Sequence, residues 1–157
     1  MVKGSNQLRI IGGEWRGRKL RFPDAPNLRP TPDRVRETIF NWLAQIIQNA
    51  RCLDLFAGSG ALGLEALSRG AAFTTFVDSH KKATHALQSH LELLNASDKA
   101  EVLQIDSIKF LKNSAQPYDL VFLDPPYHLD FMEKVVPLLE KNGWLTGNAM
   151  LYLEIEK

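Results

Sequence analysis

The residues best suited to chemistry are four aspartates, each placed where a short apolar run ends. They are Asp54, Asp78, Asp106 and Asp124. We expect these runs to be strands of a parallel sheet, whose carboxyl ends meet at one edge, where ligands bind. Carboxylates accept hydrogen bonds and attract positive charge. The spacing therefore predicts a ligand site at that edge, although one such acid by itself is more often a helix cap.

A glycine-rich stretch directly follows the first of these acids. Gly58, Gly60 and Gly63 match the dinucleotide fingerprint G-x-G-x-x-G, so nicotinamide dinucleotide binding is one interpretation and a turn without a ligand is another. Asp54 opposes the dinucleotide, because a carboxylate beside the turn repels a pyrophosphate. It attracts an ammonium or sulfonium group instead, and S-adenosylmethionine carries both. We therefore predict S-adenosylmethionine as the cofactor and helix packing as the role of Gly63.

The acids after the second and third strands suit the rest of this cofactor. Asp78 follows Gly58 by 20 residues, a distance typical of an acid that accepts hydrogen bonds from both ribose hydroxyls. Asp106 is expected to accept from an adenine amine, and capping of the next helix is the alternative for Ser107. The predicted cofactor-binding set in this region is Asp54, Phe56, Ala57, Gly58, Ser59, Gly60, Asp78, Ser79, Asp106 and Ser107.

The tetrapeptide after the fourth strand is the predicted catalytic motif. It reads Asp124-Pro125-Pro126-Tyr127. The prolines stiffen the turn and remove backbone donors, which leaves the Asp124 side chain and the Pro125 carbonyl as acceptors. Such acceptors suit an exocyclic amine, and Tyr127 offers a ring face on which a base can stack. A rigid strand exit with a helix-capping acid is the alternative interpretation.

Charge is distributed unevenly along the 157 residues. The first 36 residues carry nine basic and three acidic side chains, and the remainder has a net charge of −5. Residues 8–11 and 18–22 are predicted to form a small basic hairpin, within an arm and connector over 1–30. The predicted RNA-binding residues are Arg9, Trp15, Arg16, Arg18, Lys19 and Arg21. The alternatives are a solvated basic surface and a Trp15 that packs the arm onto the body.

The rest of the chain, residues 31–157, is predicted to be one α/β domain. Thr31-Pro32-Asp33 opens a helix whose apolar stripe contains Val35, Ile39, Trp42, Leu43, Ile46 and Ile47. Strands are expected near 52–56, 73–77, 101–105, 119–123 and 149–155, and helices near 61–69, 80–95, 107–114 and 130–141. Short apolar strands that alternate with helices predict a mostly parallel sheet covered by helices on both faces.

Several motifs resemble one enzyme family. Residues 54–60 resemble the cofactor motif of class I S-adenosylmethionine-dependent methyltransferases, and residues 124–127 resemble their amino-methylating motif. Residues 9–19, 28–31 and 34–41 resemble the RsmD family, bacterial methyltransferases that modify a guanine N2 amine in 16S ribosomal RNA. The resemblance runs from about Leu8 to the C-terminus.

The resemblance implies a Rossmann-like fold and methyl transfer to 16S ribosomal RNA or a small-subunit ribosomal particle. It also implies that Arg29, Thr31 and Arg36 close over the cofactor and that the hairpin contacts RNA. DNA N6-adenine methylation remains an alternative, because the same tetrapeptide serves it. An inactive RNA-binding module is another. The single Cys52, the lack of a signal-like or membrane-spanning run and the lack of a metal-ligand pattern predict a cytoplasmic, metal-free protein.

The chain departs from the family at its C-terminal end. Such methyltransferases usually continue with two strands after the fifth, so strands six and seven are predicted to be absent here, in a shortened or naturally short chain. An open apolar sheet edge then predicts reduced stability or self-association, whereas the full-length protein is expected to be monomeric.

Overall fold

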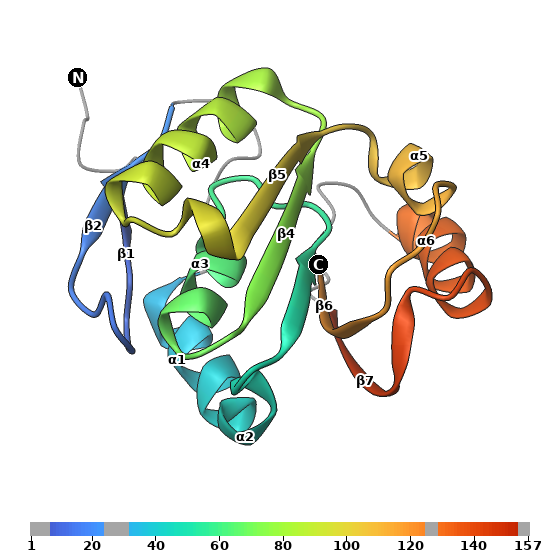
Figure 1. Ribbon diagram of the computed structural model, residues 1–157, viewed down its shortest axis with the longest axis horizontal. Helices are drawn as coiled ribbons and strands as arrows, with labels where there is room; N and C mark the ends of the chain where they lie inside the picture. Colours follow the sequence, from blue (N-terminus) through green and yellow to red (C-terminus); the bar gives the residue numbers. More distant parts are fainter. Residues whose placement is uncertain (1–6, 24–31, 125–128, 154–157) are drawn as a thin grey trace.

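A five-stranded parallel sheet forms the centre of the computed structural model, which describes residues 7–23, 32–124 and 129–153 (Figure 1). Its strand order is β5-β4-β3-β6-β7. The strands are β3 (Arg51–Asp54), β4 (Phe73–Asp78), β5 (Ala100–Gln104), β6 (Tyr118–Leu123) and β7 (Leu145–Leu153). The predicted α/β class with a parallel sheet is confirmed.

Helices cover both faces of this sheet, as predicted. They are α1 (Asp33–Trp42), α2 (Ala44–Ile47), α3 (Ala61–Ser68), α4 (Lys81–Leu93), α5 (Ser107–Leu111) and α6 (Leu129–Lys141), with a 3-10 turn, η2, at Ser97–Lys99. One core contains residues of α1, α3 and α4 packed on Cys52 and Phe76, and the other contains residues of α5 and α6 packed on Leu53 and Val77. Neighbouring residues of a strand thus enter opposite cores, which explains the continuous apolar runs.

The chain order makes β3 the point where the sheet reverses direction. From β3 the chain proceeds outward to β4 and β5, and it then returns to the other side of β3 for β6 and β7. Ligands of open α/β sheets bind beyond the carboxyl ends of the strands at such a switch point. Asp54 closes β3, and Asp124 directly follows β6. The topology therefore brings two of the four predicted acids, Asp54 and Asp124, to the carboxyl ends of neighbouring strands at the switch point.

The prediction that strands six and seven are absent is not borne out. The described part of the chain has seven strands, and β6 and β7 pair in parallel on one side of the sheet. The strands counted from the sequence did not include the two hairpin strands, and the last of them was expected to begin at residue 149. Gly147 and Asn148 disfavour a strand locally, but Leu145 pairs with Tyr118 of β6, so β7 begins there. The two residues lie in the irregular stretch between this pair and the next one, Met150 with Leu120.

The basic arm is an antiparallel hairpin of β1 (Gln7–Arg9) and β2 (Lys19–Arg21), drawn in blue at the left of Figure 1. Leu8 lies opposite Leu20, and both are buried in the same core as α1, α3 and α4. The arm is therefore packed onto the domain along its apolar face. Its alternate residues, Arg9, Lys19 and Arg21, face solvent.

Helix α1 presents a different face to the core from the one predicted. Val35 and Trp42 were expected inside, but their exposed fractions are 40% and 78%. The buried residues of α1 are Arg36, Ile39 and Phe40. The helix is turned in this way because Arg36 reaches a buried acid on α3, and because the Phe40 ring packs beside Phe122 of β6 with centroids 5.8 Å apart. Apolar spacing alone could not show that an arginine faces inward.

Candidate active site at the carboxyl edge of the sheet

Backbone hydrogen bonds hold the glycine-rich turn after β3 against the ends of β4 and β6 and close it on itself. Leu55 N donates to Phe122 O, Ala57 N donates to Val77 O, and Gly60 N closes the turn on Ala57 O at 2.8 Å. Gly60 has a φ of 82°, and a Cβ there would lie 2.2 Å from Leu87 of α4. Only glycine fits this position, since both its backbone angle and the neighbouring helix exclude a side chain.

Asp54 is buried under this turn, with an exposed fraction of 3%. Its Oδ2 accepts a hydrogen bond from Gly63 N at 3.0 Å, in the first turn of α3. Gly60, at the N-cap, has no side chain for this purpose, so Asp54 replaces the usual capping residue. A Cβ on Gly63 would lie 2.3 Å from the Phe76 ring and 3.0 Å from that oxygen, which agrees with the predicted packing role of Gly63.

The negative charges of three predicted acids affect one another at this point. Burial raises the pKa of Asp54 from 3.8 to about 7, the hydrogen bond from Gly63 opposes the rise, and the charges of Asp124 and Asp78 add to it. Like charges raise a pKa in this way only when they are close. This effect agrees with the expected approach of the strand-end carboxylates after β3, β4 and β6. A cation bound among them would relieve the repulsion.

Asp78 is oriented by both of its oxygens. Oδ2 accepts from Gly58 N at 2.9 Å, so this acid fixes the glycine turn from the end of β4. Oδ1 accepts from His80 N at 2.8 Å and pairs with His80 Nδ1 at 2.9 Å. A carboxylate has about four lone-pair positions, so these contacts leave room for a ribose hydroxyl. Ser79, between the two residues, is exposed.

Asp106 and Ser107 occupy the end of β5. Asp106 is exposed, and its Oδ2 accepts from Ile108 N and Lys109 N, which makes it the N-cap of α5. Ser107 is buried, and its hydroxyl donates to Leu55 O at 2.8 Å, so it ties α5 to the turn after β3 instead of capping a helix. The predicted contacts of both residues with an adenine ring stay predictions.

The remaining predicted site residues divide into two groups. Phe56, Gly58 and Asp124 are half-buried at the strand ends, and Ala57 and Ser59 are buried in the turn. The predicted residues that lie outside the described part of the chain are Arg29, Thr31, Pro125, Pro126 and Tyr127.

Arg36 lies apart from the strand ends and is engaged by protein groups. Its guanidinium donates to Arg9 O at 2.9 Å, to Glu65 Oε1 at 3.2 Å and to Asp33 Oδ1 at 2.6 Å. Burial lowers its pKa, and the charges of Glu65 and Asp33 oppose that effect. The geometry makes Arg36 a link between the arm, α1 and α3. Its contact with the cofactor stays a prediction.

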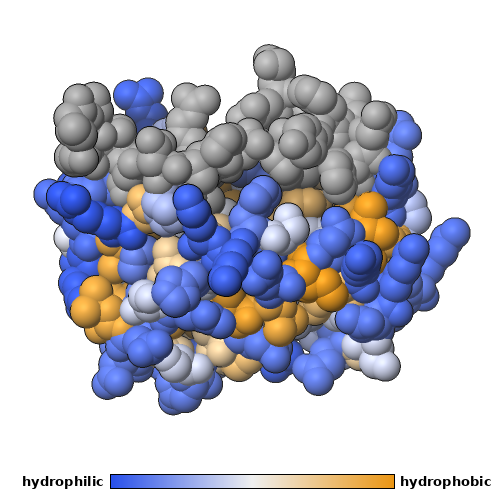
Figure 2. All heavy atoms as spheres, turned by 90° about the horizontal axis from the view of Figure 1, so that it is seen from above, coloured by the Kyte–Doolittle hydropathy of each residue, from blue (hydrophilic) through white to orange (hydrophobic). Residues whose placement is uncertain are grey.

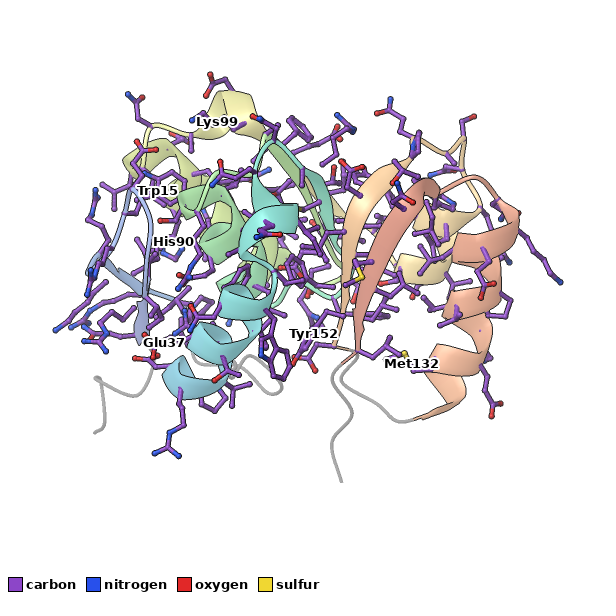
Figure 3. The ribbon with its side chains drawn as sticks, turned by 90° about the horizontal axis from the view of Figure 1, so that it is seen from below. Trp15, Glu37, His90, Lys99, Met132 and Tyr152 are labelled. Atoms are coloured by element: carbon purple, nitrogen blue, oxygen red, sulfur yellow. The ribbon has the colours of Figure 1, made fainter. Side chains whose placement is uncertain are left out.

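The arm presents its basic side chains to solvent but not its tryptophan. Arg9, Arg16, Arg18, Lys19 and Arg21 are exposed. Hydrophilic residues are spread over the whole face in Figure 2, including its left side, where Figure 1 places the hairpin. The prediction that Trp15 stacks on RNA is corrected, because the side chain is 5% exposed and has no free ring face. Trp15 packs the arm onto the body, which was the alternative; Figure 3 shows it with His90 where the hairpin meets the domain.

Sequence reasoning missed the residues that receive the arm. Glu65 and Ser68 of α3 are 0% and 4% exposed and bond to the turn that joins β1 to β2. The available signal was a glutamate within the apolar helical sequence 61–67, since a charged residue in a fully buried helix requires partners. In the described ranges, no helix is long and apolar enough to cross a membrane. The same residues contain no group of three potential metal ligands.

Comparison with known proteins agrees with this architecture. The chain is 52% identical to Ribosomal RNA small subunit methyltransferase D of Escherichia coli over 153 residues, which cover 98% of this chain and 77% of the relative. It is 49% identical to the protein of the same name from Haemophilus influenzae, covering 96% and 80%. The solved structure of Escherichia coli yhhF, provisionally named a methyltransferase, superposes with a TM-score of 0.88 at 49% identity, covering 94% and 79%.

A family model described as "Conserved hypothetical protein 95" matches residues 8–157. This span contains the arm from Leu8 onward, the glycine-rich turn and all four strand-end acids. The resemblance inferred from the motifs is confirmed, and the chain belongs to this family, the RsmD family.

Proposed function

We propose that this protein transfers a methyl group from S-adenosylmethionine to the exocyclic N2 amine of a guanine in 16S ribosomal RNA. The observation that carries the proposal is that Asp78 and Asp54 hold the glycine-rich turn and the helix after it, at the switch point of the sheet, and that the charge of Asp124 acts on Asp54. Family membership supports it, because the relatives with half of their residues identical are named ribosomal RNA small subunit methyltransferases.

The residues present fit this cofactor. Gly58 has no side chain and is half-buried, so a ligand can approach the backbone of the turn there. The charges of Asp124 and Asp78 raise the pKa of Asp54, so a cation beside Asp54 would be stabilised. When bound, S-adenosylmethionine supplies an electrophilic methyl group on a positively charged sulfur. Asp54 and the turn backbone would hold its amino-acid end, Asp78 its ribose and Asp106 its adenine edge.

Asp124 would bind the guanine amine. It is half-buried after β6, close enough to Asp54 to affect that residue's pKa, so an amine bound there lies beside the proposed cofactor site. Hydrogen bonds from the amine to Asp124 would draw the nitrogen lone pair out of conjugation and direct it at the methyl group. Catalysis would consist mainly of positioning, because the nitrogen can lose its proton after it attacks.

The RNA would meet the basic face of the arm. Its exposed cations are Arg9, Arg16, Arg18, Lys19 and Arg21. Cations of this kind contact phosphates without regard to sequence and position the strand. The target base must leave its stack to reach the edge of the sheet, which favours a nucleotide in a loop. We expect binding to weaken steeply as salt is added.

Methyl incorporation tests the proposal directly. Wild-type protein would be incubated with labelled S-adenosylmethionine and, in parallel, with 16S ribosomal RNA, small-subunit particles lacking the modification, and duplex DNA. We expect label in one of the two ribosomal substrates, at a guanine N2 position when the nucleotide is mapped. Label confined to the duplex DNA would favour N6-adenine methylation, and label in none of them would reject the proposed activity.

Substitution of Asp124 tests its role. Asp124→Ala is expected to lower kcat by about 100-fold, since loss of the amine contact misplaces the reacting nitrogen. Asp98→Ala is the matched control, because Asp98 is an exposed acid in η2, which precedes the start of β5 and so lies away from the carboxyl ends of the strands. Equal methyl transfer by the two variants would rule out the assigned role of Asp124.

A further inference from the structure

The turn that joins β1 to β2 is attached to α3 mainly through its backbone. Glu14 N donates to Ser68 O at 2.7 Å, and Trp15 N donates to the Ser68 hydroxyl at 2.9 Å. That hydroxyl donates in turn to Gly12 O at 2.6 Å. One serine at the end of α3 thus holds three consecutive peptide groups of the arm. Backbone attachment fixes a segment's path and leaves its side chains available for other contacts.

Of the three glycines in this turn, Gly12 and Gly13 lie against α3 and its end, and Gly17 does not. Gly13 has a φ of 80°, and a Cβ there would lie 2.0 Å from Ser68 O. A Cβ on Gly12 would lie 2.8 Å from the Arg69 guanidinium. Gly17, at the other end of the same turn, has a φ of 85° but no atom within 4 Å of the equivalent position. The turn therefore contains one left-handed glycine in contact with α3 and one in open space.

Glu65 is the centre of the attachment. Its carboxylate is completely buried, and Oε1 accepts from Ile11 N at 3.0 Å while Oε2 accepts from Gly12 N at 2.8 Å. Two guanidinium groups complete its environment: Arg36 from α1 at 3.2 Å and Arg69 from the end of α3 at 2.8 Å. Arg36 also donates to Arg9 O in β1. A single buried acid thus joins the arm, α1 and α3.

Helix α3 connects this attachment to the candidate active site. It begins immediately after Gly60 of the glycine-rich turn, and all eight of its residues are buried. Glu65 and Ser68 are five and eight residues beyond Gly60, which places them about 7.5 and 12 Å along the helix axis. Because a buried helix is a rigid element, the arm is held at a fixed position relative to the turn proposed to bind the cofactor.

We propose that Glu65, Ser68, Gly12 and Gly13 form a positioning junction that sets the basic arm relative to the methyl-donor site. The inference rests on the proposed function. It concerns the RNA substrate alone: the arm's cations direct the bound strand so that the target base reaches the edge of the sheet. Glu65 and Ser68 are positioning residues, since they act through the arm and touch neither substrate in this arrangement.

A positioning role and a purely structural one differ in their kinetic consequence. If the junction only stabilises the fold, disturbing it lowers the melting temperature and leaves the kinetics of the folded enzyme unchanged. If it positions the arm, disturbing it leaves a folded enzyme that binds the RNA in a less favourable position relative to the active site. KM for RNA then rises while the Kd for S-adenosylmethionine, whose site lies at the other end of α3, stays the same.

Two alanine substitutions in the same turn separate these possibilities. Gly13→Ala and Gly17→Ala both place a Cβ on a left-handed residue, so they carry a similar backbone strain, but only the first displaces the arm from α3. The full chain would be assayed with small-subunit RNA below both melting temperatures. We expect Gly13→Ala to raise KM for RNA at least tenfold over Gly17→Ala, with the cofactor Kd of the two within about twofold.

Ser68→Ala provides a second, milder measurement in case Gly13→Ala does not fold. Alanine favours a helix, so this variant removes the hydroxyl that bridges Gly12 and Trp15 without disturbing α3. We expect KM for RNA to rise about threefold over wild type, with the cofactor Kd unchanged. Equal KM values for wild type and Ser68→Ala, or for the two glycine variants, overturn this inference alone. A wild type that transfers no methyl group to RNA overturns the proposed function and this inference together.

Discussion

Asp54 and Glu65 are both buried acids at α3, Asp54 bonded to its first turn and Glu65 within it, but different groups surround their charges. Glu65 receives two backbone N–H groups and two guanidinium groups. Asp54 accepts an N–H bond from Gly63, and its pKa rises to about 7 because it is buried and because the charges of Asp124 and Asp78 add to the rise. The charge of Glu65 is balanced within the fold, whereas that of Asp54 is balanced best when a cation is bound. This difference in partners is what we expect between an acid that supports the fold and one proposed to bind a ligand.

The largest loss of stability is expected for a substitution of Glu65, the acid whose charge is balanced within the fold. Glu65→Gln leaves the guanidinium of Arg36, which is 1% exposed, without its buried counter-charge, and breaking a buried ion pair in this way costs about 3–5 kcal/mol. The free energy of unfolding in urea measures the loss. Glu37→Gln, at an exposed position of α1, is the control and is expected to change stability by less than about 0.5 kcal/mol. A small loss for Glu65→Gln would show that Asp33 alone suffices for Arg36.

Substitution of Asp54 is expected to change the free energy of unfolding in the opposite direction, by stabilising the protein at high pH. Its folded-state pKa is raised, so its contribution to stability is complete below about pH 4 and is lost as the pH rises through about 7. Asp54→Asn keeps an oxygen that can accept from Gly63 and removes this loss. The variant should therefore gain stability over wild type at pH 8, by up to about 4 kcal/mol, and match it near pH 4. Unfolding curves at both pH values measure this, and a variant less stable at pH 8 would contradict it.

A smaller effect is expected on cofactor affinity. A cation bound beside Asp54 favours the ionised carboxylate, so binding releases a proton wherever Asp54 is protonated in the free protein. The Kd for S-adenosylmethionine should rise about tenfold between pH 8 and pH 6, as isothermal titration at several pH values would show. Asp54→Asn should bind more weakly at pH 8 and lose most of this pH dependence. A pH-independent Kd in the wild type would show that Asp54 does not meet the cationic end of the ligand.

The smallest effect is expected at Asp106, where capping and ligand binding overlap. Asp106→Ala should cost about 1 kcal/mol of stability through loss of the α5 N-cap, and Asp106→Asn, which caps equally well, should cost little. The cofactor Kd separates the two roles. If Asp106 also accepts from adenine, both variants raise the Kd, since an amide is a poorer acceptor than a carboxylate. If it only caps, Asp106→Asn binds like wild type.

The elements around the site were predictable because their signals are local. Apolar runs ending in aspartate, glycines before a helix, and alternation of strands with helices depend on residues close in sequence, and the structure has these strands near the predicted positions. The errors arose where distant segments decide. The inward face of α1 depends on Glu65, the burial of Trp15 depends on α3, and the start of β7 depends on pairing with β6.

The sequence by itself therefore determined the α/β class, the family and the strand-end acids, since these follow from local pattern and motif. Only the tertiary structure decided what each acid does in the folded chain. Asp54 lies beneath the turn and receives a helix N–H, Asp78 holds Gly58, and Asp106 caps α5. A carboxylate's role depends on which donors and charges surround it, and those come from segments up to tens of residues away. The attachment of the arm to Glu65, across more than 50 residues, is the clearest case.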